Sequence, residues 1–235
     1  MNNVTAIVPA RGGSKRIANK NLREVAGKPL VKWTLDFTHA AGLRTILSSN
    51  DPQILAIGEE ISEITIHHRS ADMAGDETSM EDTVLSIIKD LDLQPSEKIL
   101  LLQPSSPLRN MTVFETFMDE VSREEEKFDE HQYFSVTQSY DDYWIKESEH
   151  WIRIREKFLT PEYRSRSTQK RDSIFIENGL FYLTSVQKLQ ELRSFVGPGA
   201  RAISTPLKYH LDINTEEDLE MAASTLCRNF PRNLK

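Results

Sequence analysis

The sequence predicts an α/β domain built around a mostly parallel β-sheet, and three observations support that fold class. Strand-like and helix-like segments alternate through the first half of the chain, as in right-handed βαβ units. The run Ile99–Leu102 is apolar without alternation, as expected for a strand that is buried on both faces. The chain's 235 residues suffice for a large core without disulfides. We therefore expect a single domain over residues 1–235.

The first half of the chain provides regularly spaced strands and helices. Short apolar runs predict strands at Val4–Pro9, Thr45–Ser48, Ile64–His67 and Lys98–Gln103. Apolar residues at helical spacing predict helices over Pro29–Ala41, Thr78–Leu91 and Met111–Val121. A further helix is expected after Asp51-Pro52, with Asp51 as its N-cap and Pro52 in its first turn.

The second half is less regular. Strands are expected at Phe134–Val136, Ala202–Thr205, Tyr209–Ile213 and, with an interruption at Glu177-Asn178-Gly179, over Ser173–Leu183. A closing helix is expected over Thr215–Arg228, where Thr215 and Asp218 form a start that resembles a capping box. Residues 138–172 are polar, aromatic and basic, so we expect them to form an excursion from the core.

Composition and charge exclude several classes of function. The net charge is −7, so we expect no general binding to nucleic acid. No apolar run is long enough to span a bilayer, and the N-terminus lacks a signal-peptide pattern. Cys227 is the only cysteine, which excludes disulfides within the chain and thiolate metal clusters. We therefore expect a cytoplasmic protein without a membrane partner.

A basic loop that contains two glycines is the strongest candidate for a binding site. The loop Arg11-Gly12-Gly13-Ser14-Lys15-Arg16 follows the first expected strand, and residues 11–32 carry seven basic side chains against one acid, Glu24. Glycines let backbone N–H groups approach phosphate oxygens, and basic side chains neutralise phosphate charge. The loop is neither a P-loop nor a dinucleotide fingerprint. An ordinary glycine turn with solvated basic residues is the alternative interpretation.

This loop is one of three polar segments that follow expected strands. Residues 10–21, 69–79 and 103–109 each come after a strand of the first half. Parallel α/β sheets bind their ligands beyond the carboxyl ends of their strands. We therefore expect the three segments to contribute to one site.

Several motifs occur in the order found in one enzyme family. They are Pro9-Ala10-Arg11-Gly12-Gly13-Ser14-Lys15, Asn19-Lys20-Asn21-Leu22, Gly27-Lys28-Pro29-Leu30, Leu102-Gln103-Pro104-Ser105-Ser106-Pro107-Leu108-Arg109 and Leu211-Asp212-Ile213-Asn214-Thr215-Glu216-Glu217-Asp218-Leu219. Through these motifs the chain resembles, over nearly its whole length, the acylneuraminate cytidylyltransferases (CMP-sialic acid synthetases). The resemblance implies a Rossmann-like, three-layer nucleotidyltransferase fold with a mostly parallel sheet. It also implies transfer of CMP from CTP to the anomeric hydroxyl of an N-acylneuraminic-type (nonulosonic) acid, with release of pyrophosphate.

The resemblance also implies which side chains bind the two substrates. Arg11 and Lys20 match the residues that stabilise the triphosphate, which makes them catalytic candidates. The other expected nucleotide-binding residues are Ala10, Gly12, Gly13, Ser14, Asn21, Arg69 and Ser79, with Thr78 as the alternative to Ser79. The expected sugar-binding residues are Gln103, Ser105, Ser106, Lys146, Asn178 and Tyr182. Asn178-Gly179 is equally typical of a hairpin turn, Tyr182 of a core residue, and Arg109 is expected to tie the Gln103 loop to a neighbouring helix.

Asp212 matches the first metal-binding aspartate of the family, which implies a Mg²⁺ or Mn²⁺ cofactor and makes Asp212 a third catalytic candidate. A divalent ion neutralises triphosphate charge and lowers the pKa of an attacking hydroxyl. Asn214 stands where the family often has a second aspartate, so one directly bound ion is better supported than two. The alternative interpretation of Asp212 is a carboxylate that caps the helix at Thr215.

The resemblance further implies partners, and it leaves alternatives. The partners are CTP, an acidic nine-carbon sugar and a second copy of the chain, because the matching excursion pairs two subunits in the family. Candidates for binding the sugar carboxylate are Lys146, Arg164, Arg166 and Arg171. Legionaminic, pseudaminic and 3-deoxy-octulosonic acids are alternative substrates. A non-catalytic nucleotide-binding homologue is the alternative class of protein.

Overall fold

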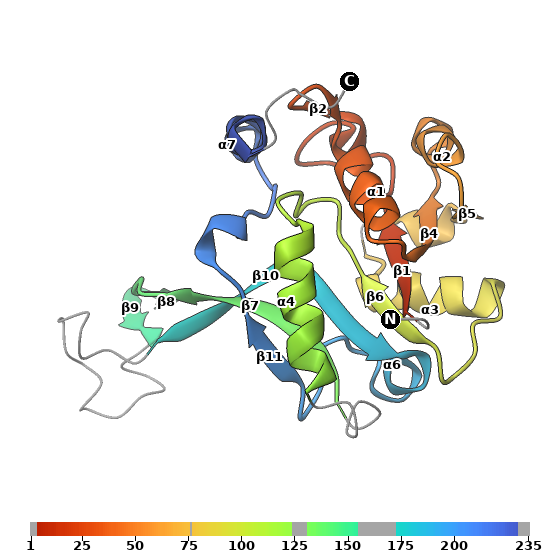
Figure 1. Cartoon of the computed structure of the whole chain (residues 1–235). Helices are drawn as coiled ribbons and strands as arrows, with labels where there is room; N and C mark the ends of the chain where they lie inside the picture. Colours follow the sequence, from red (N-terminus) through yellow and green to blue (C-terminus); the bar gives the residue numbers. More distant parts are fainter. Residues whose placement is uncertain (1–3, 76, 124–130, 155–172, 230–235) are drawn as a thin grey trace.

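A seven-stranded sheet forms the centre of the computed structural model, which describes residues 4–75, 77–123, 131–154 and 173–229 (Figure 1). Its strands are β1 (Val4–Pro9), β4 (Arg44–Ser49), β5 (Ile64–His68), β6 (Lys98–Leu101), β7 (Tyr133–Ser139), β10 (Ile174–Ser185) and β11 (Arg201–Ser204). The strand order is β11-β7-β10-β6-β1-β4-β5. Two short antiparallel pairs lie outside this sheet, formed by β2 (Glu24–Val25) with β3 (Lys28–Pro29) and by β8 (Trp144–Glu147) with β9 (His150–Arg153).

Neighbouring strands of the large sheet run parallel except at β10. Strand β1 pairs in parallel with β4 and β6, β4 with β5, and β7 with β11. Strand β10 is antiparallel to both β6 and β7. The predicted mostly parallel sheet is therefore confirmed. Residues Ile99, Leu100 and Leu101 of β6 are buried, as their continuous apolar run indicated.

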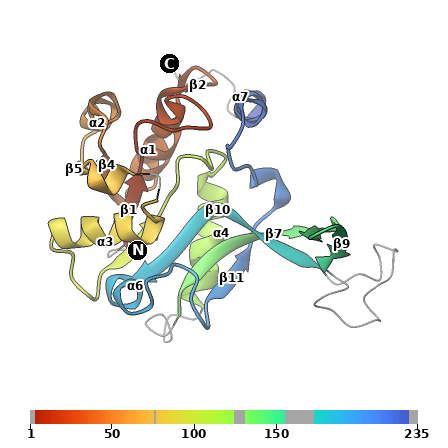
Figure 2. The ribbon, with the colours of Figure 1, turned by 180° about the vertical axis from the view of Figure 1, so that it is seen from behind.

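Helices cover both faces of the sheet and complete a three-layer fold. The described helices that do so are α1 (Leu30–Ala40), α2 (Pro52–Glu59), α3 (Met80–Asp90), α4 (Met111–Ser122) and α6 (Val186–Leu192), whereas α7 (Glu216–Asn229) packs against β2 in a separate small core. Helices α1, α2 and α4 pack on the face seen in Figure 1, and α3 and α6 pack on the face seen in Figure 2. Ala6 and Val8 of β1 belong to the first core and Ile7 to the second, because side chains alternate along a strand. Every helix of the described residues is too short or too polar to span a bilayer.

Local sequence explains where three of the helices begin. Asp51 caps α2 by accepting hydrogen bonds from two backbone N–H groups, as predicted. Ser79 caps α3, so that helix begins at Met80 rather than at the expected earlier residue. At the start of α7 the Asp218 N–H donates to Thr215 Oγ1 at 3.2 Å, and the Thr215 N–H donates to the Asp218 carboxylate at 2.9 Å. This reciprocal pair confirms the predicted capping box.

The strand expected at Tyr209–Ile213 is wrong. A 3₁₀ helix, Leu207–Tyr209, ends there, and the residues that follow are irregular. The Ile213 N–H donates to the carbonyl of Ser105 at 2.9 Å, which ties this segment to a loop. Tyr209, Leu211 and Ile213 are buried in alternation as a strand would be, so their pattern alone does not distinguish a strand from an irregular segment laid across a core.

The expected excursion is a β-hairpin as far as the structure describes it. Strands β8 and β9 pair with Ile145 opposite Ile152. The hairpin extends away from the main sheet beyond the ends of β7 and β10 (Figure 1). Trp144 and Trp151 on this hairpin are 47% and 63% exposed. The remainder of the predicted excursion, residues 155–172, lies outside the described residues.

Candidate active site

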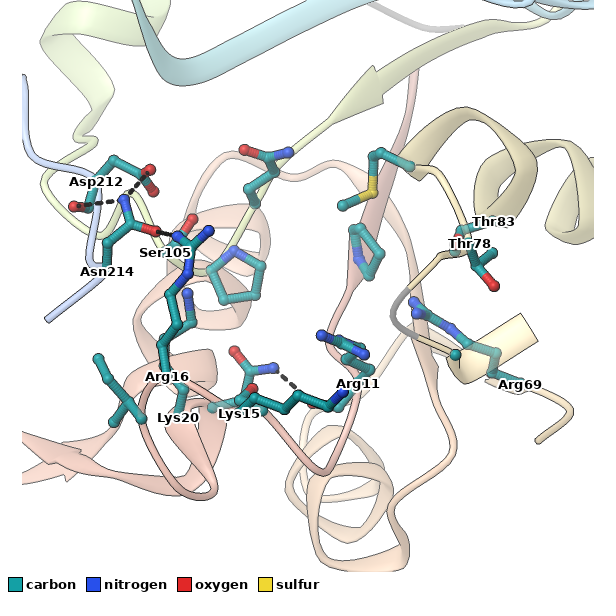
Figure 3. A pocket seen from close by; sticks show the side chains of 18 of the residues that line it. Arg11, Lys15, Arg16, Lys20, Arg69, Thr78, Thr83, Ser105, Asp212 and Asn214 are labelled. Atoms are coloured by element: carbon teal, nitrogen blue, oxygen red, sulfur yellow. Dashed lines mark hydrogen bonds between the residues drawn. The ribbon is translucent and has the colours of Figure 1, made fainter. Parts of the chain in front are cut away.

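A cavity of about 570 Å³ opens where β1, β5 and β6 end. Its lining draws on residues from all three polar segments that follow these strands, so the segments meet as expected. The cavity is lined by eight of the residues predicted for the site: Arg11, Ser14, Lys20, Asn21, Arg69, Gln103, Ser105 and Asp212. Figure 3 shows Asp212 on one side of the cavity and Arg69 and Thr78 on the other.

Positive charge dominates this cavity. Among the lining residues that the structure describes, five are basic and one is acidic, namely Arg11, Lys15, Arg16, Lys20 and Arg69 against Asp212. The whole chain carries a net charge of −7, so the charge of the cavity is opposite in sign to that of the molecule. A concave basic site of this kind attracts polyanions such as phosphates.

The loop after β1 is shaped by backbone contacts at its glycines. Gly13 has a φ of +67°, in the left-handed region that glycine tolerates best. The Gly12 N–H donates to Asn50 Oδ1 at 2.9 Å, and the Ala10 N–H donates to the Ser48 carbonyl at 2.9 Å. Ala10, Gly12 and Gly13 do not themselves line the cavity. They determine the path of the loop that does.

Arg11 and Asn21 connect this loop to its surroundings. The Asn21 side chain, which is 7% exposed, donates from Nδ2 to the Arg11 carbonyl at 2.9 Å. The Arg11 guanidinium donates from Nη1 to the carbonyl of Ala74 at 3.2 Å. The two polar segments 10–21 and 69–79 are therefore joined at the cavity wall.

Lys20 connects the same loop to the C-terminal part of the chain. It opens a 3₁₀ helix, and its Nζ donates to the Ile213 carbonyl at 2.8 Å. Burial lowers the pKa of Lys20; the charge of Asp212 opposes this shift, and the charges of Arg16 and Arg11 add to it. Lys20 is therefore a partly buried cation that lies beside the carboxylate of the cavity.

Arg69 is the most buried cation of the cavity wall. It is 8% exposed and follows β5 directly. Its Nη2 donates to the Ser48 carbonyl at 3.3 Å and its Nε to Ser48 Oγ at 3.4 Å. Burial, followed by the charge of Arg11, lowers the pKa of Arg69 to about 10. Arg69 therefore keeps its charge at neutral pH.

Asp212 lies on the opposite wall and is exposed. Asn214 Nδ2 donates to the Asp212 carboxylate at 2.7 Å, and Asn214 Oδ1 accepts from Arg16 Nη1 at 2.8 Å. Asn214 thus links the carboxylate to a cation of the loop. The alternative interpretation of Asp212 as a helix cap is wrong, because Asp218 accepts the hydrogen bonds from the backbone N–H groups of Asn214 and Thr215.

The donor set around Asp212 fits one weakly ligated divalent ion. Within the described residues, no group of three His, Cys, Asp or Glu side chains converges as a metal cluster. Mg²⁺ is commonly held by one or two carboxylates together with substrate phosphates. Asp212 supplies one carboxylate, whereas the side-chain oxygen of Asn214 accepts from Arg16. An ion here would therefore depend mainly on oxygens of the ligand.

Gln103 and Ser105 reach the cavity from the loop after β6. Arg109 supports this loop from behind and is 3% exposed. It donates to the carbonyl of Gln103 at 2.9 Å, to the carbonyl of Leu180 at 3.3 Å and to Thr34 Oγ1 of α1 at 2.8 Å. The prediction that Arg109 ties the loop to a neighbouring helix is therefore confirmed. Burial lowers the pKa of Arg109 to about 9.

Asn178 and Ser106, both predicted to bind sugar, are buried behind the same loop. Asn178 is 1% exposed; its Oδ1 accepts from Ser135 Oγ at 2.6 Å and its Nδ2 donates to Thr205 Oγ1 at 2.6 Å. Gly179 has a φ of +69°, and a Cβ there would lie 2.6 Å from Ser106 Oγ. The register of β10 shifts at this point. Neither side chain lines the cavity, so the structure gives both of them a role in supporting the loop.

Tyr182 lines a second cavity, of about 250 Å³, which shares Met80 and Gln103 with the first. The Tyr182 hydroxyl donates to Glu177 Oε2 at 3.1 Å. Burial, followed by the charge of Glu177, raises the pKa of Tyr182, so the hydroxyl stays protonated. Phe195 packs against the Tyr182 ring with centroids 6.1 Å apart. The second cavity therefore combines an apolar wall with the Tyr182 hydroxyl and the carboxylates of Glu81 and Glu177.

Ser79 and Lys146, which were also predicted for the site, line neither cavity. Ser79 caps α3, and Thr78 lines the first cavity in its place. Lys146 lies on the exposed hairpin, where its Nζ is 5.9 Å from the centre of the Trp151 ring. The three arginine candidates for the sugar carboxylate lie outside the described residues: Arg164, Arg166 and Arg171.

The lining residues that were not among the candidates include Lys15, Arg16, Met80 and Thr83. Lys15 and Arg16 lie within the predicted loop, and its density of basic residues was a signal for both. Met80 and Thr83 enter the cavity from the first turns of α3. Thr83 is a polar residue on an otherwise apolar helix face, and that departure from amphipathic spacing is the signal that could have identified it.

Comparison with known proteins adds a family and two curated relatives. Residues 5–170 match the family model described as cytidylyltransferase. The chain is 26% identical over 222 residues to the pseudaminic acid cytidylyltransferase of Campylobacter jejuni subsp. jejuni serotype O:2, covering 92% of this chain and 93% of that protein. It is 33% identical over 115 residues to the CMP-N,N'-diacetyllegionaminic acid synthase of Legionella pneumophila subsp. pneumophila, covering 45% of this chain and 47% of that protein.

A solved structure shares the fold. A CMP:2-keto-3-deoxy-manno-octonic acid synthetase complexed with CTP superposes with a TM-score of 0.68 at 14% sequence identity. The superposition covers 97% of this chain and 99% of that one. The superposition therefore confirms the expected nucleotidyltransferase fold, although a sequence identity of 14% would not establish it.

Proposed function

Because the chain belongs to the cytidylyltransferase family, we propose that it transfers CMP from CTP to the anomeric hydroxyl of a nonulosonic acid and releases pyrophosphate. The observation that carries this proposal is the basic cavity that Arg11, Lys20 and Arg69 line together with the carboxylate of Asp212. Relatives named for pseudaminic and diacetyllegionaminic acids support an acidic nine-carbon sugar as the acceptor.

The triphosphate binds along the loop after β1. Arg11 and Lys20 provide positive charge at the cavity wall, and Ser14 provides a hydroxyl. The bond from Lys20 Nζ to the Ile213 carbonyl at 2.8 Å holds the ammonium group in place before CTP arrives. Phosphoryl transfer depends mostly on positioning and on stabilising charge that develops on the leaving group. Arg11 and Lys20 perform that role for pyrophosphate.

Asp212 would hold the divalent cation, Mg²⁺ or Mn²⁺, together with oxygens of the triphosphate. When bound, such an ion neutralises triphosphate charge and lowers the pKa of the attacking hydroxyl. The Asp212 carboxylate takes the proton of the sugar hydroxyl while the oxygen of that hydroxyl forms a bond to the α-phosphorus. The bond from that phosphorus to the bridging oxygen breaks, and pyrophosphate leaves with the electron pair. Asn214 and Arg16 keep the carboxylate oriented through bonds of 2.7 and 2.8 Å.

The acid sugar occupies the second cavity, beside the α-phosphate. Gln103 lines both cavities and can contact both substrates. The Tyr182 hydroxyl and the Glu177 carboxylate suit hydroxyl or amide N–H groups of a sugar, whereas Phe195 suits the methyl of an acyl group. This division supports a substituted nonulosonic acid over a sugar without acylamino groups.

Two copies of the chain associate through the β8–β9 hairpin in the cytoplasm. Trp144 and Trp151 expose large aromatic surfaces on this projecting element. Exposed aromatic side chains that cluster on one element are typical of protein interfaces. Lys146 lies beside Trp151 and would then serve the sugar carboxylate in the partner's cavity. Sedimentation of the chain and of a Trp144→Ala/Trp151→Ala variant tests the dimer, which the variant should dissociate.

The reaction itself is tested by pyrophosphate release from CTP and Mg²⁺ with a panel of acid sugars. The panel holds N-acetylneuraminic, pseudaminic, N,N'-diacetyllegionaminic and 3-deoxy-octulosonic acids, and a reaction without sugar is the control. We expect release with at least one of the three nonulosonic acids and none in the control. Release with 3-deoxy-octulosonic acid alone would contradict the proposed acceptor class. CTP binding without release from any sugar would favour a non-catalytic homologue.

A further inference from the structure

A hydrogen-bonded chain leads from the surface of α3 to the wall of the nucleotide cavity. The Oδ2 atom of Asp90, the last residue of α3, lies 3.1 Å from Nε2 of His67. His67 Nδ1 lies 3.0 Å from Ser48 Oγ. Ser48 and His67 are register partners on β4 and β5. Arg69 Nε reaches the same Ser48 oxygen at 3.4 Å. We call Asp90, His67 and Ser48 the Asp90 chain.

The chemistry of these groups sets the direction of every bond. The pKa of Asp90 is lowered, chiefly by the hydrogen bond from His67, so its carboxylate only accepts. His67 Nε2 therefore carries hydrogen, and in the tautomer with that single ring hydrogen Nδ1 accepts from the Ser48 hydroxyl. The Ser48 hydroxyl hydrogen points to Nδ1, which turns the oxygen lone pairs toward Arg69. Each bond in such a series polarises the next.

Arg69 lies where a cation is otherwise disfavoured. It is 8% exposed, and burial together with the charge of Arg11 lowers its pKa. An arginine that is buried beside another cation needs oriented acceptors to keep one conformation. Ser48 supplies two, its hydroxyl and its carbonyl. The same carbonyl accepts from the Ala10 N–H, so Ser48 also joins Arg69 to the start of the phosphate loop.

We propose that the Asp90 chain holds Arg69 in the orientation that binds the nucleotide. This inference rests on the proposed function, because it takes Arg69 to be a CTP-binding residue. His67 and Ser48 are 6% and 0% exposed, and none of the three residues of the chain lines the cavity. They are positioning residues that act on CTP through Arg69.

Five variants of the full-length protein test the proposal. Ser48→Ala removes the hydroxyl acceptor of Arg69 and leaves the carbonyl, whereas Arg69→Ala removes the cation. His67→Asn can keep an acceptor near the Nδ1 position, whereas His67→Gln can reach Asp90 but offers Ser48 no acceptor there. Thr45→Val is the matched control. It removes a buried hydroxyl from β4, the strand that also contains Ser48, and this hydroxyl donates to the carbonyl of Leu43. Each variant is measured by calorimetric titration with CTP, by KM and kcat, and by urea unfolding.

We expect Ser48→Ala to weaken CTP binding about tenfold, which corresponds to ~1.4 kcal/mol, with kcat changed less than about twofold. His67→Gln should weaken CTP binding more than His67→Asn does. This order opposes the order of stability, because the smaller Asn leaves the larger void and should unfold more easily. In the Arg69→Ala background, Ser48→Ala should add nothing to the loss of CTP affinity.

Three results would contradict either the positioning role of the Asp90 chain or the nucleotide-binding role of Arg69. If Arg69→Ala weakens CTP binding but Ser48→Ala matches the Thr45→Val control, the Asp90 chain does not position Arg69. If CTP affinity simply follows stability across the His67 variants, the role of His67 is structural, and the proposal fails. If Arg69→Ala leaves CTP affinity unchanged, the error lies in the nucleotide role given to Arg69 under the proposed function.

Discussion

Two polar regions meet at the loop after β6. They contain similar types of side chain but differ in whether their polar groups find partners within the protein. In front of the loop is the cavity, with five basic lining residues and Asp212. Behind it is the support cluster, formed by Ser106, Arg109, Ser135, Asn178 and Thr205, all of them less than 9% exposed. The cavity gathers mainly positive charge at an open surface. The support cluster satisfies its polar groups within the protein.

The contrast shows how a binding residue differs from a structural one of the same type. Arg109 donates to a carbonyl of the loop after β6, to a carbonyl of β10 and to the hydroxyl of Thr34, so a ligand has nothing to add there. Lys20 bonds one carbonyl and, with Arg11 and Arg16, forms a group of three cations that the nearby carboxylates of Asp212 and Asp218 do not balance. A polyanion would stabilise the second arrangement and leave the first unchanged.

The largest expected effect follows from removing the carboxylate of the cavity. Asp212→Ala should lower kcat about a thousandfold, or ~4 kcal/mol of transition-state stabilisation, because the cation ligand and the proton acceptor are lost together. Its unfolding free energy should change by less than about 0.5 kcal/mol, since Asp212 is exposed. Pyrophosphate release and urea unfolding measure the two effects. Near-normal turnover in a folded variant would remove Asp212 from the mechanism.

The support cluster should respond in the reverse way. Asn178→Ala leaves Ser135 Oγ and Thr205 Oγ1 without their bonds of 2.6 Å, so we expect the unfolding free energy to fall by about 3 kcal/mol. At a temperature where the variant is folded, the KM for CTP should stay within about twofold of its original value. Asp212→Ala is the reciprocal control. A stable Asn178→Ala protein with a raised KM for the sugar would restore the sugar-binding role expected from the sequence.

The smallest effect concerns the pH dependence contributed by Lys20. Burial lowers its pKa, so the ammonium charge is lost, as pH rises, earlier than in an ordinary lysine. We expect kcat/KM for CTP to fall on the alkaline side by about tenfold. Lys20→Arg keeps its charge throughout that range and should flatten the fall. An identical alkaline limb in both proteins would show that another group titrates there.

Local patterns predicted most of the elements and the position of the site. The caps at Asp51 and Thr215 and the buried run of β6 depend on neighbours within a few residues, so they are visible in one segment of sequence. The meeting of the three polar segments followed from a rule of parallel sheets, because strand order does not alter the edge at which their carboxyl ends lie. The failed strand at Tyr209–Ile213 shows the limit, since alternating burial there comes from packing across a core.

The chain alone thus predicts the fold class, the phosphate loop and the pairing of Lys20 with Asp212 in one site, because residue type and order carry that information. The assignment of Asn178 and Ser106 to support rather than to sugar depended on the folded molecule. An asparagine before glycine reads the same in a binding strand and in a buried bulge, and its role depends on hydroxyls of Ser135 and Thr205 that are distant in sequence. Burial and hydrogen-bond partners exist only in the folded structure. They therefore distinguish a binding residue from a structural residue of the same type, which the sequence does not.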